Sequence, residues 1–298
     1  MEIELKLKLQ YFERLIAKNG SDKLFIEQFL HGNGNELKEK FWSEWSSSRL
    51  CFDLYSWLCK EKCINNFQFE KQLCGVRIGN KKYATPPNMD VFFEKGDDVV
   101  FIESKYTEKS NWKYKDDKHK DGFFLSEAYW GEHGYKSCSM SIEERFYDQP
   151  QIAELFRCFC NEIQKEINER KEKEKEKYSW FDPKQETCHL FGIIFYVLHE
   201  GIKNKNIFLC NNVYELKNSD CFIIDGSIVE IFKEKAETML NKIFKKNSCK
   251  FTFEVNTVQN MLKEGFNGID FSQAKVFAMN NVNLVDHINN KYYQKSKR

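Results

Sequence analysis

The sequence has 298 residues and a formal net charge of +1; 41% of the residues are hydrophobic and 31% are charged. This composition excludes a disordered or membrane-embedded chain, and the length predicts one large globular domain or two ordinary ones. The balanced charge gives no general attraction to nucleic acid, so binding to a polyanion would need local clusters of Lys and Arg. The charged start and the lack of a long apolar stretch predict a cytoplasmic protein without a signal peptide or membrane span.

Eleven cysteines, an odd number, are spread along the chain, and none has the CxxC spacing of zinc ribbons or redox sites. We interpret them as reduced thiols. Zinc binding by Cys59, Cys63 and Cys74, or by Cys188 beside His189, is the alternative, but inert buried cysteines are much more frequent. We assign the cysteines no function.

Residues 1–62 have apolar side chains at helical spacing, for example Leu9, Phe12 and Ile16, and are predicted to be mainly helical. From about Val76, short β-prone runs alternate with turn residues such as Gly, Pro and Asn. We therefore expect the sheet to begin near this position.

The stretch 86–108 predicts a β-hairpin. Two runs rich in Val, Phe and Ile, residues 89–94 and 99–105, flank a turn at Gly96-Asp97. Glycine at the first central position is what a type II′ turn requires. A loop of two or four residues gives the same strand register, whereas a loop of three residues would change it.

The even-length register makes Asp90 and Glu103 cross-strand neighbours, with Cβ atoms about 4.5–5.5 Å apart. That spacing is repulsive for two bare carboxylates but suits two ligands of one divalent cation. Alternation along the strand puts Lys105 on the face of Glu103 and Ser104 on the opposite side. Two acids and an ammonium group are what metal-assisted phosphodiester hydrolysis requires.

A structural interpretation of the same residues is also open. Asp90 would then cap a turn, while Glu103 and Lys105 would line a solvent-facing edge. The strongly apolar character of the opposite faces, and the position of the charged residues at strand ends, favour the metal site.

Five further segments follow the hairpin. Residues 151–177 predict a helix that ends in the mixed-charge run EKEKEKEK, which we interpret as a solvated helix or linker. The nearly unbroken apolar run 189–199 predicts a strand buried on both faces. Residues 228–244 predict an amphipathic helix, 251–255 a short strand and 258–262 another helix.

Asp on one strand, followed by Glu-x-Lys on the next, resembles the PD-(D/E)XK nuclease superfamily, to which many restriction endonucleases belong. The fuller string from PPNMD to ESKYTE is similar to uncharacterised bacterial restriction-endonuclease-like proteins. The close match covers residues 70–108. The resemblance implies an α/β fold with a restriction-endonuclease-like αβββαβ core, in which helices flank a mixed central sheet, and here a helical N-terminal region is added.

The resemblance also implies roles for the hairpin residues. Asp90 and Glu103 would bind Mg²⁺, with Mn²⁺ as a substitute, the main-chain carbonyl of Ser104 would add a ligand, and Lys105 would assist the nucleophile. The domains expected on this basis are a helical N-terminal region, a nuclease core with a charged helix or linker near 164–180, and a C-terminal helical extension with a basic tail. Their expected boundaries are 1–47, 48–262 and 263–298.

Two assignments remain open because the sequences do not align securely. The superfamily often has a further acid on the preceding helix; here Glu70 is the candidate, with Asp53 as the alternative. Gln149 and Gln151, at the start of the following helix, are similar to glutamines in some branches of the superfamily. Glutamines at a helix start are usually structural.

Basic and aromatic residues alternate after the hairpin, where Lys109, Lys113 and Lys115 accompany Trp112 and Tyr114. Lysines can neutralise phosphates and rings can stack on bases, so this segment predicts a DNA-binding surface. A solvated loop, in which nearby acidic residues offset the positive charge of the lysines, is an equally good interpretation.

We therefore expect a magnesium-dependent DNA endonuclease of the type II restriction or defence kind. Its partners would be double-stranded DNA, and optionally a cognate DNA methyltransferase and a second copy of the chain. The alternatives are a structure-specific nuclease of DNA repair or recombination, and a non-catalytic DNA-binding protein of the same fold. The intact set Asp90, Glu103 and Lys105 argues against the non-catalytic alternative.

Overall fold

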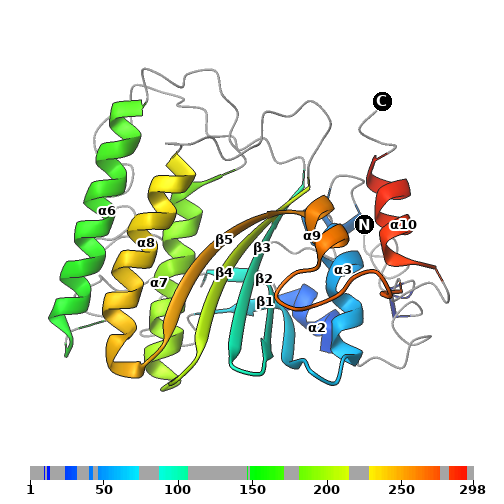
Figure 1. Cartoon of the computed structure of the whole chain (residues 1–298), viewed down its shortest axis with the longest axis horizontal. Coiled ribbons are helices and arrows are strands. Elements are labelled where there is room, and N and C mark those ends of the chain that lie inside the picture. Colours follow the sequence, from blue (N-terminus) through cyan, green and yellow to red (C-terminus); the bar gives the residue numbers. More distant parts are fainter. Residues whose placement is uncertain are drawn as a thin grey trace.

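A mixed five-stranded β-sheet separates the helices into two layers (Figure 1). The computed structural model describes residues 10, 12–13, 24–31, 40–42, 46–73, 87–106, 146, 148–170, 181–214, 228–275 and 282–293. The strands lie in chain order: β1 (Asn65–Gln72), β2 (Asn88–Lys95), β3 (Asp98–Lys105), β4 (Asn206–Val213) and β5 (Lys250–Thr257). β1, β2 and β3 are antiparallel neighbours, whereas β3, β4 and β5 run parallel. The predicted α/β class with a mixed, helix-flanked sheet is confirmed.

Each face of the sheet has its own apolar core. One face packs against α6 (Pro150–Arg170), α7 (Pro183–His199) and α8 (Ile228–Phe244). The other packs against α2 (Leu24–His31), α3 (Ser47–Tyr55), α9 (Val258–Glu264) and α10 (Leu284–Ile288). Shorter helical turns are η1 (Lys40–Trp42), η2 (Ser56–Lys60), η4 (Lys245–Asn247) and the π-helical η5 (Asn289–Tyr293). None of the described helices is both long and apolar enough to cross a membrane.

The described parts of the expected N-terminal and C-terminal regions belong to the apolar core on the face of the sheet that packs against α3. Phe29 of α2, Leu50 of α3 and Leu284 of α10 are fully or almost fully buried in the same apolar cluster as Val91 and Ile102 of the sheet. Both terminal regions therefore contribute to the face that carries α3.

The predicted hairpin is confirmed. β2 and β3 are joined by Gly96 and Asp97, and the pairs Lys95–Asp98 and Phe92–Phe101 are those expected from an even-length turn. Gly96 has a φ of 58°, the left-handed value that the first central position of a type II′ turn demands. The register of the site therefore follows from this turn.

Three of the later elements are also confirmed. α8 spans the predicted residues 228–244, β5 contains the predicted strand 251–255, and α9 contains the predicted helix 258–262. α6 confirms the start of the helix predicted for 151–177. The charged run that follows it lies outside the described residues.

The prediction of a buried strand at 189–199 is wrong, because these residues form the second half of α7. A helix that is apolar all round shows no helical periodicity, and α7 is covered by the sheet on one side and by α6 and α8 on the other. At Gly192 a side chain would lie 2.7 Å from Cβ of Leu73, so glycine allows this helix to approach the end of β1 closely.

The predicted start of the sheet near Val76 is also wrong. β1 begins at Asn65, before that position, and Val76 itself lies outside the described residues. β4, an interior strand that lies between β3 and β5, was not predicted. Asn211 and Asn212 interrupt its apolar pattern, although both side chains are fully buried.

The outer edge of β5 is covered by side chains of α8. Asn241 accepts a hydrogen bond from the N–H of Phe251 at 2.7 Å and donates one to the carbonyl of Phe251 at 3.1 Å. Glu237 accepts from the N–H of Phe253 at 2.9 Å. These contacts satisfy edge groups that would otherwise be open to another strand.

Candidate active site

Three carboxylates stand in one row across β1, β2 and β3. The ladder pairs on either side of Glu70 place this residue opposite Asp90. The β2–β3 ladder ends at the pair Val91–Ile102, one residue before Asp90 and Glu103. The predicted cross-strand relation of Asp90 and Glu103 therefore lies directly beyond the last ladder pair and stays a prediction, and Glu70 extends the row.

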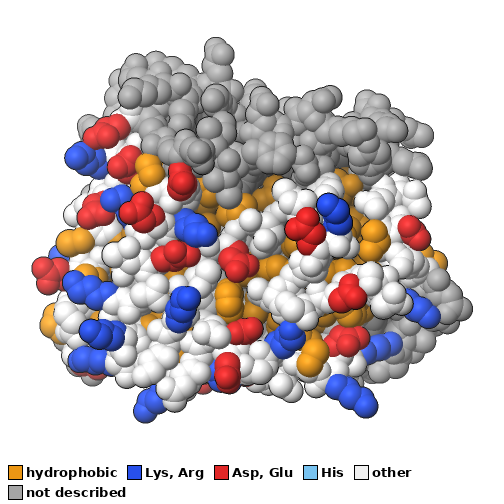
Figure 2. Space-filling model, in the orientation of Figure 1, with side chains coloured by type: hydrophobic (Ala, Val, Ile, Leu, Met, Phe, Trp, Pro, Cys, Tyr) orange, Lys and Arg blue, Asp and Glu red, His pale blue; other side chains and the backbone are white. Residues whose placement is uncertain are grey.

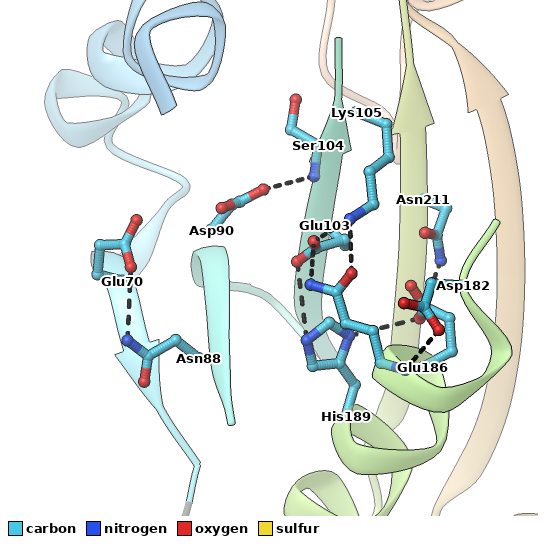
Figure 3. Close-up of polar contacts among 11 residues, drawn as sticks. Glu70, Asn88, Asp90, Glu103, Ser104, Lys105, Asp182, Glu186, His189 and Asn211 are labelled. Atoms are coloured by element: carbon cyan, nitrogen blue, oxygen red, sulfur yellow. Dashed lines mark hydrogen bonds and ion pairs between the residues drawn. The ribbon is translucent and has the colours of Figure 1, made fainter. Parts of the chain in front are cut away.

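The ladder between β2 and β3 opens at Asp90. Backbone pairing ends at Val91, and the N–H of Ser104 donates instead to Oδ2 of Asp90 at 2.7 Å (Figure 3). In a regular antiparallel ladder this N–H would donate to the carbonyl of Met89. A side-chain carboxylate thus replaces a backbone acceptor where the strands diverge.

The backbone of Ser104 faces this opening. The carbonyl of Lys105 accepts from the N–H of Tyr214, so the backbone groups of Lys105 point toward β4. Adjacent residues alternate, so the N–H and C=O of Ser104 point toward β2. The carbonyl predicted to be a metal ligand is thus on the side of Asp90.

Glu70 lies on β1, so its prediction as an acid on the preceding helix is wrong. Its φ is 50°, an uncommon value for a residue with a side chain, and Oε2 accepts from Nδ2 of Asn88 at 3.4 Å. The left-handed residue changes the face of the strand: Phe69 packs on the α3 side, whereas Leu73 packs on the α7 side, although alternation would keep both on one face. Strain of this kind is frequent at functional sites.

Asp53, the alternative helix acid, is on α3 but is occupied elsewhere. Its buried carboxylate accepts from Nε of Arg49 at 3.1 Å and from the hydroxyl of Tyr292 at 2.8 Å, and it pairs with Lys291 and His287. Burial alone would raise the pKa of Asp53, but Arg49, His287 and Lys291 hold it well below its ordinary value. Asp53 fastens the C-terminal segment to α3.

Glu103 and Lys105 form a closed ring of hydrogen bonds with Gln185 at the start of α7. Nζ of Lys105 donates to Oε1 of Glu103 and to Oε1 of Gln185, both at 2.7 Å. Nε2 of Gln185 returns a hydrogen bond to Oε1 of Glu103 at 2.8 Å. Glu103 and Lys105 are only 4% and 5% exposed, so the ion pair is shielded from water and from salt.

A second group of polar side chains, His189, Glu186 and Asn211, lies next to Glu103 (Figure 3). Nε2 of His189 is 3.8 Å from Oε2 of Glu103, and Nδ1 of His189 is 3.5 Å from Oε2 of Glu186. Nδ2 of Asn211 donates to the same Glu186 oxygen at 3.2 Å. Burial alone would lower the pKa of His189, but Glu103 and Glu186 outweigh it and raise the pKa above its ordinary value.

The sequence interpretation missed Gln185, Glu186 and His189, although a signal for their helix was present. Asp182 accepts from the N–H of Gln185 at 3.2 Å and precedes a proline at the first helical position, which is a typical helix start. This start would have extended the run 189–199 back to 183, too long for a buried strand.

The glutamine that contacts Glu103 and Lys105 is Gln185 rather than Gln149 or Gln151. Gln151 is exposed on the first turn of α6, and the N–H of Gln149 bonds the carbonyl of Phe146. The lysines predicted to contact DNA, Lys109, Lys113 and Lys115, lie outside the described residues.

No protein-family model matches the chain, and no curated protein or solved structure matches it.

The donors around Asp90 suit a hard divalent cation by their chemistry. Carboxylate and carbonyl oxygens are the ligands that Mg²⁺ and Mn²⁺ prefer. Among the residues that the structure describes, no three Asp, Glu, His or Cys side chains are arranged to hold a metal ion. The reason is visible in the contacts: Asp90 is bonded to Ser104, while Glu103 is turned toward α7.

The charges themselves favour such a cation. Burial, Glu103 and Glu70 raise the pKa of Asp90 well above its ordinary value, and the Ser104 N–H and Lys105 reverse only part of this. The ionised Asp90 carboxylate therefore destabilises the metal-free fold. A divalent cation would remove that repulsion.

We expect Asp90→Asn to raise the free energy of unfolding of the metal-free protein at pH 7 by about 1 kcal/mol. A raised carboxyl pKa means that the ionised group destabilises the fold, and the wild type gains stability as the pH falls through that pKa. The variant should lack this gain. Urea unfolding of both proteins between pH 5 and pH 8 measures it, and a less stable variant at pH 7 would contradict the proposed repulsion.

Proposed function

We propose that this protein is a metal-dependent phosphodiesterase that cleaves DNA and has a restriction-endonuclease-like core. The observation that carries the proposal is the row Glu70, Asp90 and Glu103 at the opened end of the hairpin, next to the buried ammonium group of Lys105. Among the described elements, α3 is followed by β1, β2 and β3, then by the two helices α6 and α7, and then by β4, so the order matches helix, three strands, helix, strand except for the additional helix α6. This order supports the αβββαβ core that the sequence resemblance implies.

The proposed cation is Mg²⁺, with Mn²⁺ as a substitute. Asp90, Glu103 and the carbonyl of Ser104 would hold it, and Glu70 lies opposite Asp90 as a further oxygen donor. Bound there, the cation would supply positive charge that stabilises the phosphodiester transition state. The other chemical roles are assigned to side chains of the protein.

Lys105 is the proposed proton-handling and phosphate-contacting group. Its ammonium nitrogen is oriented by two acceptors at 2.7 Å, one on Glu103 and one on Gln185. An ammonium group fixed beside the carboxylates can orient a water molecule, hold a proton and stabilise negative charge on a phosphate oxygen. Gln185 bonds both partners, so it positions Lys105 relative to Glu103.

DNA as the substrate is proposed from the resemblance of residues 70–108. On the face shown in Figure 2, Lys and Arg side chains alternate with Asp and Glu among the described residues. Such a mixed surface does not attract a polyanion strongly at long range. Contacts with the phosphate backbone of DNA are therefore proposed for the segment that contains Lys109, Lys113 and Lys115.

Incubation with supercoiled plasmid tests the proposal. We expect relaxation or linearisation with Mg²⁺ or Mn²⁺, and no cleavage with excess EDTA. Discrete, reproducible fragments would identify a restriction-type enzyme, whereas cleavage confined to branched, flapped or single-stranded substrates would identify a repair or recombination nuclease.

Metal binding is measured separately by thermal unfolding. If a cation binds the folded state, saturation at about 100 times its Kd stabilises the protein by about 2.7 kcal/mol. The absence of both metal-dependent stabilisation and cleavage would refute the proposed function.

A further inference from the structure

A buried cluster of polar side chains joins the neighbouring strands β3 and β4 to α7. Glu103 of β3 and Asn211 of β4 are register neighbours in the parallel ladder. Glu186 and His189 lie one helical turn apart on α7 and meet them (Figure 3). Glu186 and Asn211 are fully buried, and His189 is 2% exposed. Burial of a carboxylate is costly, so such a group is expected to have a defined partner.

The two oxygens of Glu103 have different surroundings. Oε1 accepts from Lys105 at 2.7 Å and from Gln185 at 2.8 Å. Oε2 faces Nε2 of His189 at 3.8 Å. The imidazole therefore faces the oxygen that Lys105 and Gln185 leave, at ion-pair distance but beyond the range of a direct hydrogen bond.

Glu186 in turn fixes the imidazole. Its Oε2 lies 3.5 Å from Nδ1 of His189 and accepts from Nδ2 of Asn211 at 3.2 Å. A buried carboxylate that orients a histidine, which then orients a metal ligand, is the arrangement of residues that support a metal centre from behind.

We propose that His189, held by Glu186 and Asn211, is a positioning residue that keeps the Glu103 carboxylate on the α7 side of β3, where Lys105 and Gln185 also contact it, and so sets how this ligand is presented to the cation. The proposal rests on the proposed function, in which Glu103 is a metal ligand. His189 acts through Glu103 and does not contact the substrate. Gln185 positions the ammonium group of Lys105, and His189 positions the carboxylate of Glu103.

The test compares His189→Leu with His189→Gln. Leucine fills the buried space without a donor, whereas the amide nitrogen of glutamine can take the place of Nε2. We expect Mn²⁺ to bind His189→Leu about 10–100-fold more weakly than the wild type, as measured by metal-dependent thermal unfolding, and His189→Gln to recover most of the affinity. Thr187→Val is the matched control, since it removes a buried hydroxyl that bonds the Pro183 carbonyl on the same helix.

The outcomes separate this inference from the function on which it rests. Wild-type affinity for Mn²⁺ in a folded His189→Leu variant would overturn the positioning role alone. Equal loss in the Leu, Gln and Thr187→Val variants would indicate disturbed helix packing and would also overturn it. A wild type that binds no Mn²⁺ and cleaves no DNA would overturn the proposed function as well.

Discussion

Lys105→Ala is expected to lower the rate of metal-dependent DNA cleavage by about 10²–10⁴-fold, the usual contribution of a positioned acid or base. The variant removes the ammonium group that bonds Glu103 and Gln185, while the hydrogen bond from Gln185 to Glu103 remains. DNA affinity should change little, because Lys105 would contact only the phosphate being cleaved, whereas the other phosphate contacts are proposed for the segment that contains Lys109, Lys113 and Lys115. Single-turnover cleavage and DNA binding in Ca²⁺ measure the two quantities separately.

The control for Lys105→Ala is Lys71→Met. Lys71 is a partly exposed lysine of β1, and its Nζ lies over the rings of Phe92 and Tyr196, 5.0 and 5.2 Å from their centroids. Its loss removes a lysine from the sheet without touching Glu103. A folded Lys105→Ala protein that cleaves at the wild-type rate would refute the assigned role of Lys105.

Asp53→Ala is expected to lower the free energy of unfolding by about 3–5 kcal/mol, the effect of removing one partner from a buried ion pair. The substitution leaves Arg49, Lys291 and Tyr292 without their shared acceptor and loosens the C-terminal segment from α3. Urea unfolding at pH 7 measures the loss. Asp286→Ala, an exposed acid on α10, is the control and should change stability little.

The effect of Asp53 should depend on pH with a defined sign. Its pKa is held below the unfolded value of about 3.9, so its stabilisation is complete above that value and is lost as the pH falls toward the folded pKa. The difference in stability between the wild type and Asp53→Ala should therefore shrink below about pH 4. A difference that grows with acidity would contradict the ion-pair assignment.

The hairpin could be predicted from the sequence because its determinants are local. A glycine at the first turn position favours a two-residue loop, and for a loop of even length alternation then determines which residues face each other. The prediction that Asp90, Glu103 and Lys105 share one end of the hairpin was made in this way. The opening of the ladder at Asp90 could not be predicted, since it depends on a side-chain carboxylate that competes with a backbone carbonyl for the Ser104 N–H.

The α7 side of the site depends on tertiary contacts that local patterns do not report. Because α7 is covered by the sheet and by other helices, its apolar run resembles a buried strand. The first turns of this helix, which carry Gln185, Glu186 and His189, were therefore not predicted. Glu70 was found by its residue type but was placed on the wrong kind of element. Its left-handed backbone reverses the facing of β1, which no alternation pattern anticipates.

The covered edge of β5 has a consequence for self-association. A second chain could add a strand to the sheet there only by displacing Asn241 and Glu237 from the backbone of Phe251 and Phe253. Repeated pairing of strand edges between chains, the first step toward cross-β aggregates, is therefore blocked along this part of β5. If two copies act together on the two strands of a duplex, their contact must be made by another surface.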